Sequence, residues 1–188
     1  MAVDRKKAEQ AIATFLAALG HDPAATPELS RTPELVTEAF ERELLSGYAV
    51  DVPALLATES GKLGASDARG VVVVRGVHVA TMCPHHLLPG VGTATVAYLP
   101  GERVVGIGAL ARVVDAFARR LTLQEAIGEA VVRALLDHAG ARGAYCRLEL
   151  SHACLSARGA RQSEATVVTI ARAGAAISDG DLASGIQS

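Results

Sequence analysis

The stretch VHVATMCPHHLLPG, residues 77–90, concentrates side chains that can do chemistry. Cys83, His85 and His86 lie within four positions of a chain that has only 3 cysteines and 6 histidines. Cysteine and histidine are preferred protein ligands of zinc. A tight loop brings residues i and i+3 together, so Cys83 and His86 could bind one metal ion. Two ligands do not complete a site, and the others must come from elsewhere in the chain.

A second pair of possible ligands lies in SHACLSARG, residues 151–159. His152 and Cys154 are two positions apart, which places them on one face if this segment is a strand. Two cysteines and one histidine, with the fourth position left to water, form a catalytic zinc arrangement. The alternative is that Cys83, Cys146 and Cys154 are buried small side chains. The spacing favours the metal for the cluster and core packing for Cys146.

Composition and charge narrow the class of protein. The chain has 188 residues, 50% hydrophobic and 20% charged, which is typical of a single globular domain. A formal net charge of −2 provides no basic field for nucleic acid. No apolar run reaches the roughly 18 residues of a membrane span, and MAVDRKKAEQ has no signal-peptide pattern. We expect a cytoplasmic protein with no nucleic-acid or membrane partner.

Two helices are expected on the N-terminal side of the segments that contain the possible metal ligands. One runs from a cap at Asp4 to Gly20, and another from a cap at Thr32 to near Gly47. Residues 52–70 lack a clear period and are predicted to form a loop, with one helical turn at most. The expected parts are an N-terminal helical segment (1–50), a catalytic domain (51–175) and a flexible C-terminal tail (176–188).

Alternating apolar residues predict that the CPHH loop joins two antiparallel strands. Thr122 and Glu125 have the spacing of a capping box at the start of a helix. The order of elements predicts an α+β domain with helices packed on an antiparallel sheet. The expected strands are 71–81, 92–101, 103–108, 143–159 and 165–173, with helices at 109–120 and 122–140.

Four ordered motifs, CPHHLLPG, ARVVDAFARR, LQEAIGEAVV and SHACLSARG, resemble the GTP cyclohydrolase I family over about residues 22–172. The resemblance implies the tunnelling fold and a decamer of two pentamers, with active sites between subunits. It also implies zinc-dependent opening of the imidazole ring of GTP. In that reaction C8 leaves as formate and the product is 7,8-dihydroneopterin triphosphate.

The resemblance also assigns roles to individual positions. It makes Cys83, His86 and Cys154 the ligands of Zn²⁺, and His85 and His152 the acid/base pair. Two histidines near a zinc-activated water could move protons at neutral pH. The substrate-binding residues that it implies are Gln124 and Glu125 for guanine, and Arg112 and Arg158 for the triphosphate.

Departures from the family pattern concentrate where the triphosphate is held. Leu35 and Glu38 stand where the family has an arginine and a lysine, and Ala109 replaces another lysine. Charge-assisted contacts contribute about 1.5 to 3 kcal/mol each, so these losses should weaken triphosphate binding strongly. Either other cations such as Arg119 and Arg120 substitute, or the substrate carries fewer phosphates, as GMP or guanosine do.

Two further alternatives remain open. Gly108 replaces a serine that the family links to the later rearrangement, so the reaction could stop at a formamidopyrimidine. A non-catalytic pterin- or purine-binding protein with structural zinc is a third possibility. Retention of both His85 and His152 beside an open metal position argues against it, because a structural zinc site favours four protein ligands.

Overall fold

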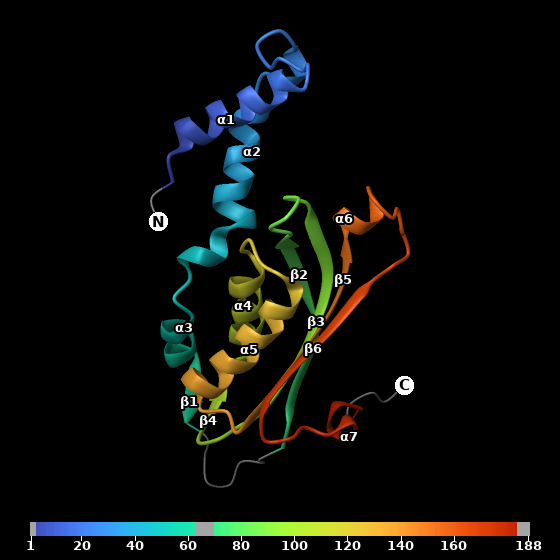
Figure 1. Cartoon of the computed structure of the whole chain (residues 1–188). Coiled ribbons are helices and arrows are strands. Elements are labelled where there is room, and N and C mark those ends of the chain that lie inside the picture. The colour runs from blue at the N-terminus through green and yellow to red at the C-terminus, as the bar shows by residue number, and fades with distance from the viewer. Residues whose placement is uncertain (1–2, 63–69, 184–188) are drawn as a thin grey trace.

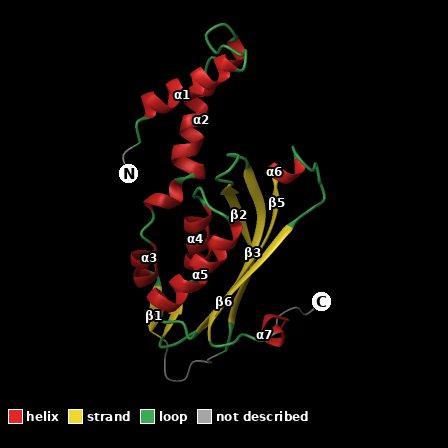
Figure 2. Ribbon diagram, in the orientation of Figure 1, coloured by secondary structure: helices red, strands yellow, loops and turns green. Residues whose placement is uncertain are grey.

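The computed structural model describes residues 3–62 and 70–183, and its centre is an antiparallel sheet with strand order β2-β3-β5-β6 (Figure 1). Two long helices cover one face of this sheet (Figure 2). The predicted α+β class is therefore confirmed. The strands are β2 (Val72–Met82), β3 (Pro89–Leu99), β5 (Gly143–His152) and β6 (Val167–Gly174), and the covering helices are α4 (Ile107–Ala118) and α5 (Gln124–Ala139).

The core between sheet and helices is built from small aliphatic side chains. Val79, Val96 and Leu148 from the strands are fully buried, as are Val113 and Val131 from the helices. The helix residues recur at a spacing that gives one apolar face, and the strand residues alternate between the two sheet faces. The sheet and the two helices therefore share one packed core, and the loops at their ends project from it.

The strand register brings the two chemistry-bearing segments to one end of the sheet. Met82 pairs with Pro89 across β2 and β3, so the CPHH loop is the connection between these strands. Gly90 pairs with His152 across β3 and β5. The loop and the end of β5 are therefore neighbours, although they lie far apart in the sequence.

Several boundaries differ from the sequence-based expectations. The expected loop contains α3 (Val52–Thr58) and β1 (Ser60–Lys62), and β1 pairs with β4 (Arg103–Val105) in a separate small sheet. The capping box at Thr122 does not form, because α5 begins at Gln124 and its N-cap, Leu123, makes no side-chain hydrogen bond. The last expected part of the long strand instead forms the short helix α6 (Ala153–Ser156).

The N-terminal segment projects away from the sheet (Figures 1 and 2). Its first helix has no buried residue and packs on the second helix. The second helix starts at Thr32, so this residue is not the expected cap. A π-helical turn and a 3-10 turn follow it. The elements are α1 (Arg5–Ala18), η1 (Pro27–Leu29), α2 (Thr32–Ala39), η2 (Phe40–Leu44) and η3 (Ser46–Ala49).

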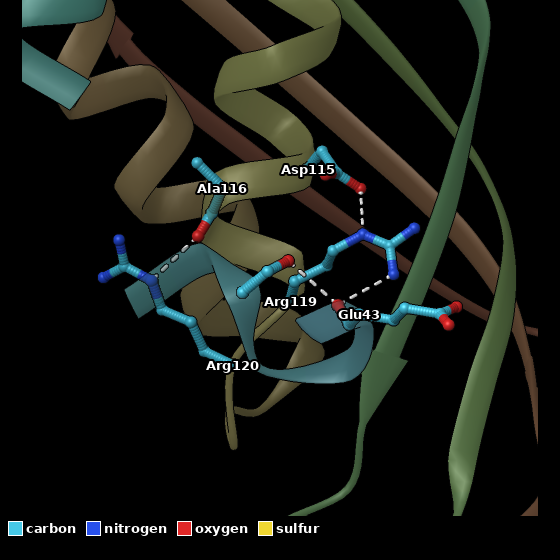
Figure 3. A network of polar contacts seen from close by, with 6 residues as sticks. Glu43, Asp115, Ala116, Arg119 and Arg120 are labelled. Atoms are coloured by element: carbon cyan, nitrogen blue, oxygen red, sulfur yellow. Dashed lines mark hydrogen bonds and ion pairs between the residues drawn. The ribbon is translucent and has the colours of Figure 1, made fainter. Parts of the chain in front are cut away.

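Polar contacts join these last turns to the end of α4 (Figure 3). The Nε of Arg119 donates to Asp115 at 2.7 Å, and its Nη1 donates to the backbone oxygen of Glu43 at 3.0 Å. The Nε of Arg120 donates to the backbone oxygen of Ala116 at 2.8 Å. The Nη2 of Arg120 donates to the backbone oxygen of Gly47 at 3.0 Å. Both guanidinium groups therefore connect the N-terminal segment to α4.

The C-terminal residues that the structure describes pack on the other face of the sheet. Ile177 is buried against Ala97 and Tyr145, and α7 (Asp179–Ala183) follows. Residues 184–188 of the expected tail lie outside the described residues. No helix in the described ranges 3–62 and 70–183 is long and apolar enough to cross a membrane.

Candidate metal and catalytic site

The CPHH loop is a tight turn held by its own backbone. The N–H of Leu87 donates to the oxygen of Cys83 at 2.9 Å, and the N–H of Cys83 donates to the oxygen of Leu88 at 3.0 Å. Leu87 has a φ of 51°, in the left-handed region that closes such turns. The turn brings Cys83 and His86 to the same side, as their spacing predicts.

Cys83, His86 and Cys154 come together in three dimensions. Their ligand atoms all lie within 4.8 Å of one another, and the Sγ of Cys83 is 3.7 Å from the Nδ1 of His86. Two atoms that bind one tetrahedral zinc at normal bond lengths are about 3.6 Å apart. The distance between Cys83 and His86 matches this value, so the three side chains form a possible metal site.

Cys154 is placed in this cluster by a short helix that the sequence did not indicate. The prediction that His152 and Cys154 share a strand face is wrong, because β5 ends at His152 and Cys154 lies in α6. Burial and the neighbouring Cys83 raise the pKa of Cys154, and Arg158 partly opposes this shift. Two thiolates this close repel each other, and a divalent cation between them would relieve the repulsion.

His152 lies at the end of β5 with its ring held by Gln124. The Nε2 of His152 is 2.7 Å from the Oε1 of Gln124, and Gln124 is only 4% exposed. Burial lowers the pKa of His152 below its ordinary value, and the negative charge of Glu125 partly opposes this effect. A neutral imidazole is therefore favoured near pH 7, and it can accept a proton.

The other predicted residues near the cluster are exposed. The Nδ1 of His85 lies 3.9 Å from the Sγ of Cys83, and Glu125 lies in the first turn of α5. The Nη1 of Arg158 is 2.9 Å from the Nε2 of His86. Because arginine can only donate, this nitrogen of His86 accepts.

Arg112 has a partner that the sequence did not reveal. Its Nη2 lies 2.8 Å from the Oε2 of Glu59. The backbone oxygen of Glu59 accepts from the N–H of Gly106, the N-cap of α4, so this residue lies at the start of that helix. Glu59 was missed because it falls in a segment that was predicted to be a loop.

The departures at the triphosphate positions have different surroundings. Leu35 is exposed on α2, and Glu38 forms an ion pair with Arg42 at 3.0 Å. Ala109 is fully buried in the core. Arg119 and Arg120, the candidate substitutes for the lost cations, are committed to the contacts with the N-terminal segment described above.

The remaining cysteine and histidines lie outside this cluster. Cys146 is fully buried in the core, as its sequence context predicts, and burial raises its pKa to about 12. His138 lies in the last turn of α5, and His21 follows α1. The described residues contain one group of three or more histidine, cysteine or acidic side chains that are close enough to hold a metal ion. This group is Cys83, His86 and Cys154.

Comparison with known proteins agrees with the motifs. Residues 8–187 match the family model described as GTP cyclohydrolase I. GTP cyclohydrolase 1 of Leifsonia xyli is 43% identical over 171 residues, which cover 91% of this chain and 87% of that protein. The corresponding protein of Pelagibacter ubique is 40% identical, covering 89% and 81%, and that of Chromobacterium violaceum is 42% identical, covering 88% and 78%. The chain therefore belongs to the GTP cyclohydrolase I family of hydrolases, and its antiparallel sheet with helices on one face is the tunnelling fold of that family.

Proposed function

We propose that this protein is a zinc-dependent cyclohydrolase that opens the imidazole ring of a guanine nucleotide at C8. Formate leaves, and the reaction proceeds toward 7,8-dihydroneopterin triphosphate. The single observation that carries the proposal is the convergence of Cys83, His86 and Cys154 beside His152 at one end of the sheet. Family membership supports the same chemistry.

The proposed ligands of the metal are Cys83, His86 and Cys154. Zinc bound there would act as a Lewis acid and activate water for attack on the ring. Binding through the Nδ1 of His86 would leave Nε2 protonated, so Arg158 could no longer donate to it. Arg158 would then be available for an anionic group of the substrate.

The chain's own groups supply proton transfer and recognition. The lowered pKa of His152 favours its neutral form, and Gln124 holds its ring in place, so His152 would accept a proton during attack at C8. His85, exposed beside Cys83, would donate a proton to the departing ring nitrogen. The carboxylate of Glu125 would accept hydrogen bonds from the N–H groups of guanine.

A formate-release assay with zinc-loaded protein tests the proposal. GTP, GMP and guanosine are incubated in parallel, and formate, the ultraviolet spectrum of the product and zinc content are measured. His85→Ala and His152→Ala should keep zinc but lower turnover, because a positioned proton donor or acceptor typically contributes about 10²- to 10⁴-fold. His21→Ala is the matched control. Absence of formate from all three compounds would favour the non-catalytic pterin- or purine-binding alternative.

The surroundings of Arg112 favour a second candidate, the same ring opening on a compound with fewer phosphates. Glu59 places a carboxylate on Arg112, and Leu35, Glu38 and Ala109 supply no cation. A substrate polyphosphate would have to displace Glu59. Faster turnover of GMP or guanosine than of GTP in the assay above would select this candidate.

The family resemblance also supports proposals about assembly and location. We propose a homo-oligomer, a decamer of two pentamers, in the cytoplasm. Velocity sedimentation of the purified protein tests the assembly. A monomer that turns over the substrate would contradict a site shared between subunits.

A further inference from the structure

The orientation of the Gln124 side chain is fixed by what surrounds its nitrogen. Nε2 lies 2.9 Å from the backbone oxygen of Val167, 3.1 Å from the Oγ1 of Thr169 and 3.3 Å from the backbone oxygen of Leu148. Backbone oxygens can only accept hydrogen bonds, so the amide nitrogen must face β5 and β6. The amide oxygen therefore faces His152.

This orientation determines which nitrogen of His152 carries the proton. The Oε1 of Gln124 can only accept, and it lies 2.7 Å from the Nε2 of His152, so Nε2 donates. In the neutral ring the lone pair then lies on Nδ1. A Cβ at Gly90 would lie 2.8 Å from this Nδ1. Because Gly90 has no side chain, the ring of His152 can pack this close to β3 with Nδ1 unprotonated.

We propose that Gln124 is a positioning residue that holds His152 as the Nε2–H tautomer and makes Nδ1 the atom that exchanges a proton with the substrate. This inference rests on the proposed catalytic role of His152. It differs from the guanine contact that the family resemblance implies for Gln124. The two N–H groups of the amide already face three acceptors, and the side chain is 4% exposed, so the amide offers no donor to a base.

Nitrogen-15 NMR of the imidazole rings tests the tautomer without depending on catalysis. Zinc-loaded protein labelled with [15N]histidine is measured by magic-angle spinning, and the His152 signals are assigned by their loss in His152→Gln. A protonated Nε2 and an unprotonated Nδ1 are expected. A ring protonated at Nδ1 in the wild-type protein would overturn the proposal, whatever the activity proves to be.

Gln124→Met tests the positioning role, because methionine has a similar length and lacks the amide. Its His152 signals should shift toward a mixture of tautomers, and its kcat should fall at least about 10-fold. Zinc content and the KM for GTP and guanosine should stay within about twofold. Thr169→Val is the matched control, since it removes one acceptor and leaves both backbone oxygens to orient the amide. It should keep the tautomer and kcat.

The outcomes separate this inference from the proposed function. A raised KM with unchanged kcat in Gln124→Met would show that the amide binds the base, and the positioning role would be wrong. Wild-type protein that releases no formate but shows the Nε2–H ring would refute the function and leave the tautomer assignment standing. If Gln124→Met fails to fold, the wild-type spectrum still decides the tautomer.

Discussion

The ion pair between Arg112 and Glu59 makes a quantitative prediction about substrate choice. Its atoms are 2.8 Å apart, but the side chains are 55% and 38% exposed, so solvent screens the pair. Such exposed pairs contribute about 0.2 to 1 kcal/mol. A guanidinium contact to a phosphate contributes about 1.5 to 3 kcal/mol. A phosphate can therefore displace Glu59, but the free energy of the lost ion pair offsets part of the free energy of the new phosphate contact.

Two substitutions separate the contribution of the Arg112–phosphate contact from that of the Arg112–Glu59 ion pair. Arg112→Gln removes the phosphate contact, and kcat/KM for GTP should fall about 10- to 150-fold while that for guanosine is unchanged. Glu59→Gln removes the competing carboxylate, and the ratio of kcat/KM for GTP over guanosine should rise by up to about fivefold. Steady-state kinetics on both compounds, at fixed ionic strength, measures these ratios.

Glu102→Gln is the matched control for the change in net charge, because Glu102 is an exposed residue in the turn before β4. It should leave the ratio unchanged. Equal losses for GTP and guanosine in Arg112→Gln would show that Arg112 does not contact phosphate. An unchanged ratio in Glu59→Gln would show that the carboxylate does not restrain Arg112, and the argument for a less phosphorylated substrate would lose its main support.

Four further predictions test the site and the fold. Cys154→Ser should lose zinc and activity together, and full zinc occupancy by metal analysis would remove this residue from the ligand set. Glu125→Ala should weaken binding of guanine compounds by at least about 100-fold with zinc retained, as measured by calorimetry, and unchanged affinity would point to another pocket. Gly92→Ala should lower the free energy of unfolding by about 1 to 3 kcal/mol, because its Cβ would lie 2.1 Å from a backbone oxygen of β5. Gly108→Ala, in α4 with nothing within 4 Å, should leave this free energy unchanged or raise it by up to about 1 kcal/mol in the same denaturation experiment. Burial raises the pKa of Cys146 to about 12, so its thiol stays protonated at pH 8 and should resist iodoacetamide in the native protein, which peptide mapping by mass spectrometry would detect.

The sequence by itself determined the kinds of side chain that the site contains. CPHH and the His-x-Cys pair identify possible metal ligands because ligand preference is a property of residue type, and the turn that brings Cys83 and His86 together spans few residues. Hydrophobic periodicity predicted the sheet and its covering helices, since these patterns follow from backbone geometry. It failed at α6, where a strand pattern continues past His152 but the chain turns into a helix.

Only the tertiary structure decided which partners these side chains have. Gln124 and His152 are 28 positions apart, and His86 and Arg158 are 72 apart, so no local pattern links them. The sequence does not indicate that Arg119 and Arg120 have partners, yet each donates a hydrogen bond to a backbone oxygen of the N-terminal segment. Whether a polar group is free to bind substrate depends on which hydrogen bonds its neighbours have already taken. The register of the sheet and the packing of α4 and α5 determine those neighbours, and residue type does not.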